Sequence, residues 1–183
     1  MTTTEAPPSS STWNIDPVHS SIEFAVKHLM FTTVKGRFRD VEGSIDIVPN
    51  DPSRSSVRAT IKAASIDTRT GQRDDHLRSV DFLHAEQFPE LTFTSTHISG
   101  DADTFKVTGQ LTIRGVTREV TLDASREGAG PDPWGGERIG FSATTKLDRR
   151  DFGLVWNQAI ETGGVVVGNE VKVSIEVQAV RQG

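Results

Sequence analysis

The sequence contains no cysteine and no tyrosine among its 183 residues. The lack of cysteine excludes disulfide bonds, catalysis by a thiol and metal sites built on thiolates, and it leaves the redox compartment open. The net charge is -5 at pH 7, and the positive charges are scattered among negative ones. A protein that reads nucleic acid needs a basic field. The composition therefore predicts no nucleic acid partner.

Long apolar runs are also missing. The first residues, MTTTEAPPSSST, are polar, whereas a secretory signal has a basic start and an apolar stretch of about 7–15 residues. No segment approaches the ~18 apolar residues of a transmembrane helix. We expect a disordered tail over residues 1–11, one domain over residues 12–183, no stable membrane insertion and a cytoplasmic location.

What the sequence has in abundance is alternation of apolar and polar residues. In residues 20–29, SSIEFAVKHL, one side of an extended chain carries Ile22, Phe24, Val26 and His28. A half-buried strand has this period of two. Strand patterns recur at residues 12–16, 34–48, 55–66, 91–99, 105–113, 116–124, 138–147 and 171–179. These strands predict an all-β sandwich or closed barrel, and closure, which removes sheet edges, favours an eight-stranded antiparallel barrel.

Two of these patterns carry a further detail. In residues 34–48 the apolar positions change parity near Asp40, which predicts a bulge or a sharp bend there. In residues 91–99 the apolar face is expected to hold Leu91, Phe93, Ser95 and His97.

Two segments lack the period of two. In residues 67–91, Thr70 or Gly71 can cap a helix that has acidic residues in its first turn, and Leu77 lies three positions before Val80. We expect a short helix and a tight loop packed over one end of the barrel. Residues 149–168 are expected to do similar work.

The inward faces of the predicted strands include several small residues, namely Gly36, Gly43, Ala59, Ala63, Gly109 and Ala143. An eight-stranded barrel is filled by its own side chains or holds one small ligand. Because protein interiors are close-packed, small inward residues suggest room for a ligand. Alternatively, the glycines mark bulges or coiling of the strands. Spacing alone leaves both interpretations open.

Five blocks of the sequence follow one another with natural spacing: TWNIDPVHSSIEFAVKH, VKGRF, IDTRTGQRDDHLRSVDFLHAEQFPELTF, GQLTIRGVTREVTL and GFSATTKLDRRDFG. From Trp13 to Val180 the chain resembles the YceI-like family of bacterial polyisoprenoid-binding proteins. The resemblance implies a lipocalin-like antiparallel β-barrel whose lumen holds a long isoprenoid lipid, as a polyprenyl phosphate or a quinone. Many members are exported to the periplasm, whereas no signal pattern is visible here.

An isoprenoid chain forms no hydrogen bonds, so apolar walls are sufficient contacts for it. The residues expected to contact it are Phe24, Val26, His28, Phe38, Leu77, Phe82, Phe93, Leu111, Ile113, Phe141 and Leu147. No other cofactor is expected, and a homodimer is left open.

Three residues are candidates for contact with a polar headgroup, namely His28, Arg73 and Arg149, because guanidinium groups match phosphate oxygens. For each of them a structural role is the alternative. His28 would then bond a backbone carbonyl at the rim, and the arginines would pair with the aspartates that alternate with them in the sequence.

Catalysis and metal binding have little support. The sequence contains no GxSxG motif, glycine-rich phosphate loop or zinc signature, and its five histidines lack HxH or HExxH spacing. Asp74 and Asp75 would diverge by about 100° on a helix. The sequence therefore favours a protein that carries or sequesters a lipid. The alternatives are an enzyme acting on a quinone or prenyl-type substrate, and a stress-response structural protein with a filled barrel.

Overall fold

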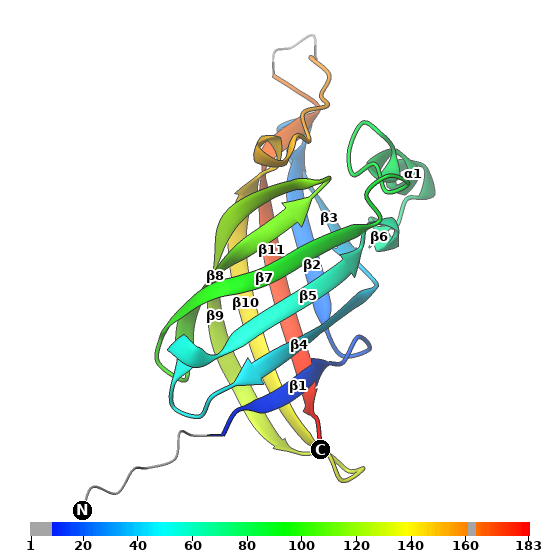
Figure 1. Cartoon of the computed structure of the whole chain (residues 1–183). Helices are drawn as coiled ribbons and strands as arrows, with labels where there is room; N and C mark the ends of the chain where they lie inside the picture. Colours follow the sequence, from blue (N-terminus) through cyan, green and yellow to red (C-terminus); the bar gives the residue numbers. More distant parts are fainter. Residues whose placement is uncertain (1–8, 161–163) are drawn as a thin grey trace, which may run out of the picture.

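The computed structural model describes residues 9–160 and 164–183, and within these ranges the chain is mostly β-strand (Figure 1). The strands are β1 (Ser11–Ile15), β2 (Ser21–His28), β3 (Thr32–Phe38), β4 (Val41–Ile47), β5 (Ser56–Lys62), β6 (Ile66–Asp67), β7 (Glu90–Gly100), β8 (Thr104–Ile113), β9 (Val116–Pro131), β10 (Glu137–Asp148) and β11 (Val167–Arg181). The helices are α1 (Gly71–Arg78) and the 3₁₀ turns η1 (Pro52–Arg54), η2 (Ala63–Ser65) and η3 (Arg149–Phe152).

The eleven strands of the described residues form a closed barrel with eight positions, because three of these positions are each occupied by two strands that follow one another in the chain. Strands β1 and β2 pair with successive parts of β11, β3 and β4 pair with β2 and β1, and β5 and β6 pair with β4 and β3. Strands β7 to β11 then follow in chain order, each antiparallel to the one before it. The predicted eight-stranded antiparallel barrel is confirmed.

The change of parity near Asp40 is confirmed as a break between two strands. β3 ends at Phe38 and β4 begins at Val41. Across the break, Arg39 N donates to the carbonyl of Ser65 at 3.1 Å, and Lys62 N donates to the carbonyl of Asp40 at 3.0 Å. The bend therefore keeps its backbone bonded while both strands turn apolar side chains inward.

The face predicted for residues 91–99 is wrong beyond Ser95. The pairing of β7 with β8 shifts register between Ser95 and His97, as a β-bulge does. The Ser95 hydroxyl accepts a hydrogen bond from Val57 N at 2.9 Å. As a result Ile98 is buried, and His97 is exposed.

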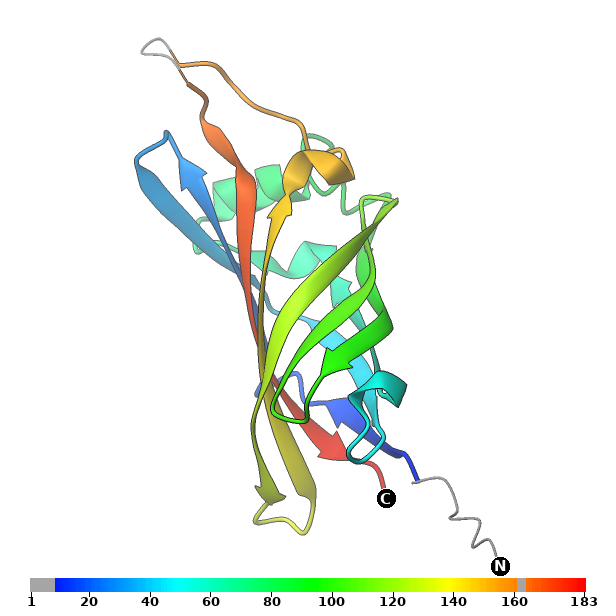
Figure 2. The ribbon, with the colours of Figure 1, turned by 90° about the vertical axis from the view of Figure 1, so that its left-hand side faces the viewer.

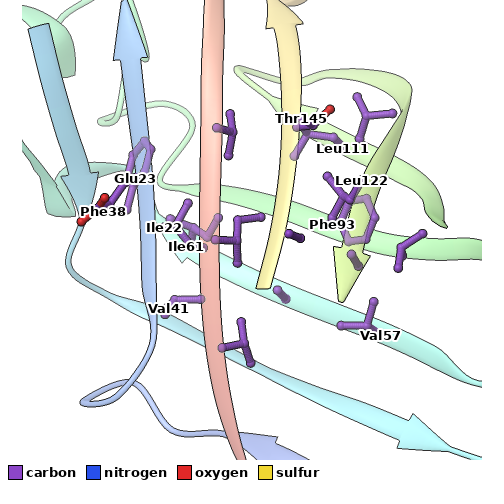
Figure 3. A pocket seen from close by; sticks show the side chains of 18 of the residues that line it. Ile22, Glu23, Phe38, Val41, Val57, Ile61, Phe93, Leu111, Leu122 and Thr145 are labelled. Carbon is purple, nitrogen blue, oxygen red and sulfur yellow. The ribbon is translucent and has the colours of Figure 1, made fainter. Parts of the chain in front are cut away.

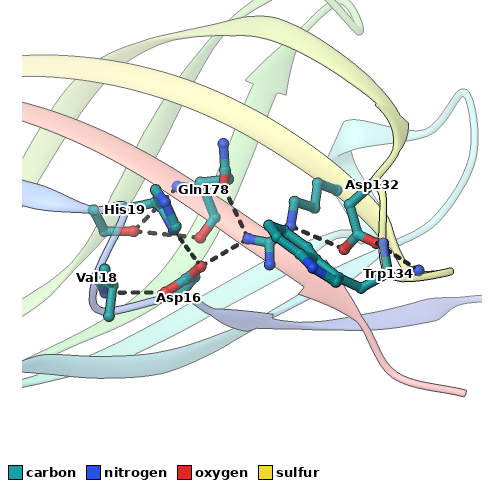
Figure 4. Close-up of polar contacts among 9 residues, drawn as sticks. Asp16, Val18, His19, Asp132, Trp134 and Gln178 are labelled. Atoms are coloured by element: carbon teal, nitrogen blue, oxygen red, sulfur yellow. Dashed lines mark hydrogen bonds and ion pairs between the residues drawn. The ribbon is translucent and has the colours of Figure 1, made fainter.

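A polar network joins the break between β1 and β2 to the hairpin of β9 and β10 (Figure 4). The Asp16 carboxylate accepts from Arg138 Nη1 at 2.7 Å and lies 2.7 Å from His19 Nδ1. Arg138 Nε also donates to Asp132 at 3.0 Å. The hydrogen bond from Arg138, with a smaller contribution from His19, lowers the pKa of Asp16 to about 2. His19 is thus part of a structural network.

The two ends of the barrel differ (Figures 1 and 2). At one end, here called the covered end, lie residues 68–89 with α1, residues 149–160 with η3, residues 164–166, and the β2–β3 and β8–β9 turns. At the other, the terminal end, lie β1 and the C-terminal residues. The expected helix and loops over one end are confirmed. For residues 1–8, the predicted tail lies outside the described residues, and Ser11 already pairs with Ile47.

The cover is packed onto the strands by buried apolar side chains. Phe82 and Leu83 from one covering segment and Phe152 and Leu154 from the other form one cluster with strand residues such as Ile61. Arg114 at the β8–β9 turn donates to the carbonyls of Val80 and Phe82 at 2.6 and 2.8 Å. No helix in the described ranges is long and apolar enough to cross a membrane.

Candidate functional site

The interior of the barrel is a cavity of about 860 Å³ whose wall extends from the covered end to the terminal end. Its lining is overwhelmingly apolar and draws on every position of the ring; Figure 3 shows part of it, including Ile61, Phe93 and Leu122. The period of two explains the lining, since alternate residues of one strand all face inward. Pockets of roughly 300–1,000 Å³ with apolar walls are typical of ligand sites in proteins.

The glycines do not provide this space. A Cβ atom at Gly36 would collide with the ring of Phe24, and one at Gly109 would lie 2.5 Å from Phe93 Cζ, so each glycine lets an aromatic ring pack on the backbone. Among the six small inward residues, the cavity is lined only by Ala59 and Ala143. Of the two interpretations left open, room for a ligand therefore holds for the alanines Ala59 and Ala143 and not for the glycines. The empty volume lies instead between aliphatic side chains, many of them valine, that do not reach across the lumen.

Every residue predicted to contact the ligand lies on the cavity wall. These are Phe24, Val26, His28, Phe38, Leu77, Phe82, Phe93, Leu111, Ile113, Phe141 and Leu147, together with Arg73 and Arg149. The structure thus brings the predicted set together around one volume, and contact with a ligand stays a prediction.

At the covered end, the predicted contact Phe82 is joined by two aromatic rings that were not among the predicted contacts, those of His76 and Trp156. The Trp156 ring lies edge-on to His76 at a centroid distance of 4.7 Å and tilted against Phe82 at 5.4 Å, and all three residues line the cavity. His76 Nε2 is 2.9 Å from Asp81 Oδ2, which fixes its ring. The sequence signal for Trp156 is its alternation with Phe152 and Leu154, in a segment predicted to cover the barrel.

Arg149 is buried at the cavity wall with 5% of its surface exposed. Its guanidinium donates to four backbone carbonyls, those of Leu154 (2.6 Å), Gly168 (2.8 Å), Trp156 (2.9 Å) and Val167 (3.4 Å). Burial lowers the pKa of this guanidinium. Because a guanidinium has five N–H groups, one remains without a protein acceptor in the described part of the chain.

The neighbour of Arg149 behaves differently. Arg150 is exposed and pairs with Asp148 at 2.6 Å, and its hydrogen bonds to that carboxylate lower the pKa of Asp148 to about 2. Within the described ranges Arg149 has no carboxylate at ion-pair distance. The structural alternative of paired Arg and Asp therefore holds for Arg150 and not for Arg149.

Arg73 is held by the segment that precedes α1. Its Nε donates to the Thr68 hydroxyl and its Nη2 to the Thr68 carbonyl, both at 2.8 Å. No hydrogen bond within the described residues uses Nη1. Arg73 is thus oriented at the cavity wall with donors to spare.

His28 is the last residue of β2, and it lines the cavity. Among the residues described, its ring makes no hydrogen bond, so the carbonyl contact offered as its structural role is not seen there.

The acidic residues of α1 are structural. Asp74 is buried and accepts from the backbone N and the hydroxyl of Thr68, at 2.8 and 2.5 Å. Asp75 pairs with Arg78 at 3.0 Å on the exposed side of the helix. The two carboxylates are therefore separately engaged and do not act as a pair. In the described part of the chain no group of three His, Asp or Glu residues could hold a metal ion.

The charged residues that line the cavity differ between its two ends. The lining at the covered end includes Arg73 and Arg149, whereas the lining at the terminal end includes three carboxylates, Asp51, Asp101 and Glu137, and one cation, Arg126. Two further lining residues of opposite charge, Glu23 and Lys27, are exposed on the outward parity of β2. A negatively charged group entering the cavity is therefore favoured at the covered end.

Comparison with known proteins shows the family to which this barrel belongs. Residues 13–179 match the family model of the YceI-like domain. The chain belongs to the YceI-like family. Protein YceI of Escherichia coli O17:K52:H18 is 40% identical over 164 residues, which cover 90% of this chain and 83% of the relative. Protein YceI of Salmonella newport is equally similar over the same length. The resemblance found in the five sequence blocks is confirmed.

Several solved structures have the same fold. The Campylobacter jejuni YCEI protein is 36% identical, with a TM-score of 0.71 over 86% of this chain and 90% of that chain. Burkholderia cenocepacia BcnA has a TM-score of 0.78 at 22% identity, covering 90% and 98% of the two chains. A polyisoprenoid binding domain from Saccharophagus degradans has a TM-score of 0.67 at 15% identity, covering 91% and 97%. The last two likenesses concern the fold alone.

Proposed function

We propose that the protein binds a long isoprenoid lipid, with the prenyl chain in the barrel cavity and the headgroup at the covered end. The observation that carries this proposal is the continuous apolar cavity of about 860 Å³. Side chains around an empty volume lose packing contacts, which an apolar ligand restores. The Saccharophagus degradans domain of the same fold is named for polyisoprenoid binding, which supports the same class of ligand here.

The shape of the cavity supports a chain rather than a compact ligand. Its lining includes residues near both ends of the barrel, such as Trp156 at the covered end and Ala129 at the terminal end. The wall between them is built of aliphatic and aromatic side chains, which match a branched hydrocarbon without hydrogen bonds. Each buried CH₂ group contributes about 0.8 kcal/mol, so the chain supplies most of the binding free energy.

The charges support an anionic headgroup, such as the phosphate of a polyprenyl phosphate, over a neutral quinone. Arg149 is a buried cation without a carboxylate partner in the described residues, and Arg73 keeps its Nη1 hydrogens available. A phosphate near them would balance a charge that is otherwise compensated only by carbonyl dipoles. His28, on the same stretch of wall, is a further donor for it.

The first test is extraction of the purified protein with organic solvent, followed by mass spectrometry. The expected result is a prenyl lipid in nearly stoichiometric amount. Stable protein that is repeatedly recovered empty, and that takes up no prenyl lipid when one is added, would contradict the proposal.

The second test concerns the headgroup. A prenyl phosphate and the prenyl alcohol of the same chain length are compared by competition against a fluorescent prenyl probe. Arg73→Gln should reduce the preference for the phosphate, whereas Arg126→Gln, which removes a cavity cation at the terminal end, should leave that preference unchanged. The opposite pattern would place the headgroup at the terminal end.

A further inference from the structure

The turn between β2 and β3 presents three consecutive apolar residues to solvent. Met30 and Phe31 are 59% and 80% exposed, and Leu29 is also exposed. We call residues 29–31 the apolar tip. It projects at the covered end (Figure 2). Exposed apolar residues that occur singly need no explanation, but a contiguous exposed group marks a site of interaction with a protein or a membrane.

At two of its residues, the backbone of the apolar tip adopts a left-handed conformation, in which large apolar residues are rarely found. Leu29 and Met30 have φ angles of 51° and 69°, in the left-handed region where glycine and asparagine are common and bulky residues are rare. Large apolar side chains thus stand at positions where their backbone is strained and their surface is exposed. Neither feature stabilises the barrel, which indicates a role outside the fold.

Basic residues flank the apolar tip. Residues 27–37, KHLMFTTVKGR, contain Lys27, Lys35 and Arg37 and no acidic residue, although the whole chain has a net charge of -5. Arg37 lies 3.7 Å from the carboxylate of Asp67, which leaves the two lysines as the free positive charges of this segment among the described residues. Lys27 and Lys35 are exposed on the outer face of the β2–β3 hairpin. Within the described ranges neither lysine pairs with a carboxylate.

The apolar tip adjoins the cavity without forming its wall. The cavity is lined by Val26, His28 and Val34, which lie directly below the tip on β2 and β3, whereas residues 29–31 do not line it. Two other exposed apolar residues, Val80 and Val155, lie at the same covered end. Exposed apolar residues thus lie beside the part of the barrel where we place the headgroup, and Lys27 and Lys35 lie on the hairpin that carries the apolar tip.

The geometry points to a docking surface for an anionic lipid bilayer, on which the apolar tip enters the headgroup region while Lys27 and Lys35 face lipid phosphates. Peripheral proteins bind membranes through this combination of a small apolar insertion and nearby basic residues. A convex tip with a basic surround fits a bilayer better than it fits a second barrel, whose outer faces are also convex. The inference rests on the proposed function for its purpose, since a carrier of a membrane lipid must meet the bilayer.

The test is co-flotation of the full chain with vesicles of phosphatidylcholine alone or mixed with phosphatidylglycerol. We expect the wild-type protein to float with the mixed vesicles and to be released as salt is raised. Leu29→Ser/Met30→Ser/Phe31→Ser should lower the bound fraction at least about tenfold, because the inserted apolar surface is lost. Lys27→Gln/Lys35→Gln should weaken binding to the mixed vesicles and reduce its dependence on salt.

The matched control is Trp134→Ser, which removes an apolar residue that is 78% exposed at the terminal end, and it should float as the wild type does. Equal flotation of the triple serine variant, or no flotation of the wild type on either vesicle, would overturn the inference. So would a wild-type dimer, seen by light scattering, that becomes monomeric in the triple serine variant without any binding to vesicles.

Lipid uptake separates this inference from the proposed function. A prenyl lipid added from ethanol, without vesicles, should enter the wild type and the triple serine variant equally, as measured by native mass spectrometry. If neither protein takes up the lipid but the wild type still floats through the apolar tip, the proposed function fails and the docking surface stands.

Discussion

Arg149 donates a hydrogen bond to the carbonyl of Trp156 at 2.9 Å, so a buried cation holds in place the aromatic residue that lies across the covered end of the cavity. The same guanidinium bonds the carbonyl of Gly168 next to the start of β11. One side chain therefore fixes the covering segment to the barrel wall and carries the charge to which we assign the headgroup.

Replacing this arginine should destabilise the fold. In Arg149→Met the carbonyls of Leu154, Trp156 and Gly168 lose their donor, and each buried unsatisfied group costs about 1–3 kcal/mol. We expect the free energy of unfolding in urea to fall by about 3 kcal/mol or more. Arg150→Met, at the exposed neighbour, should change it by less than about 1 kcal/mol. Equal losses in the two variants would show that Arg149 is no anchor.

Filling the cavity should remove the ligand and leave the fold intact. Ala143 lines the cavity, so in Ala143→Phe the ring enters empty space and avoids the ~1–3 kcal/mol penalty of an overpacked core. We expect unchanged stability in urea and a loss of prenyl lipid in solvent extracts. Gly109→Ala is the contrast, because its methyl group would meet Phe93 Cζ at 2.5 Å and should destabilise the protein. If Ala143→Phe were destabilised as well, the lumen would already be filled.

The fold could be predicted from the sequence because a strand that is buried on one face has an apolar residue at every second position. Even the break at Asp40 was visible, since a bend must change the parity of inward residues. The bulge at Ser95 was not. It depends on a hydroxyl accepting a bond from Val57, which lies on a neighbouring strand, and the sequence of one strand contains no sign of that contact.

The wall of the candidate site was predictable for the same reason, and its ends were not. Phe141 and Leu147 follow from alternation, and both line the cavity. Trp156 reaches it from an irregular segment whose course depends on Arg149 and its carbonyl partners. The role of the glycines could not be decided from the sequence, because a missing side chain can leave a void or admit a neighbouring ring. Only the structure shows that Phe24 packs on Gly36 and Phe93 on Gly109.

Affinity should depend on the length of the prenyl chain. Each additional isoprene unit buries further carbon atoms at about 0.8 kcal/mol per CH₂, until the chain fills the cavity of about 860 Å³. Competition with prenyl phosphates of increasing length should therefore show affinity that rises and then levels off. A short phosphate analogue binding as tightly as the long lipid would show that the headgroup, and not the chain, provides the affinity.

Acid should weaken the junction between β1, β2 and the β9–β10 hairpin. The folded pKa of Asp16 is about 2, below the value of about 3.9 for an unfolded aspartate. Its carboxylate therefore stabilises the fold above pH about 4, and this contribution is lost as the pH falls from about 4 to about 2. In urea denaturation across this range, Asp16→Asn should be less stable than the wild type at neutral pH and should converge with it in acid. Glu119→Gln, at an exposed position of β9, should follow the wild type throughout. A gap between Asp16→Asn and wild type that stayed constant down to pH about 2 would mean that Asp16 stabilises the junction by its shape and hydrogen bonds, without its charge.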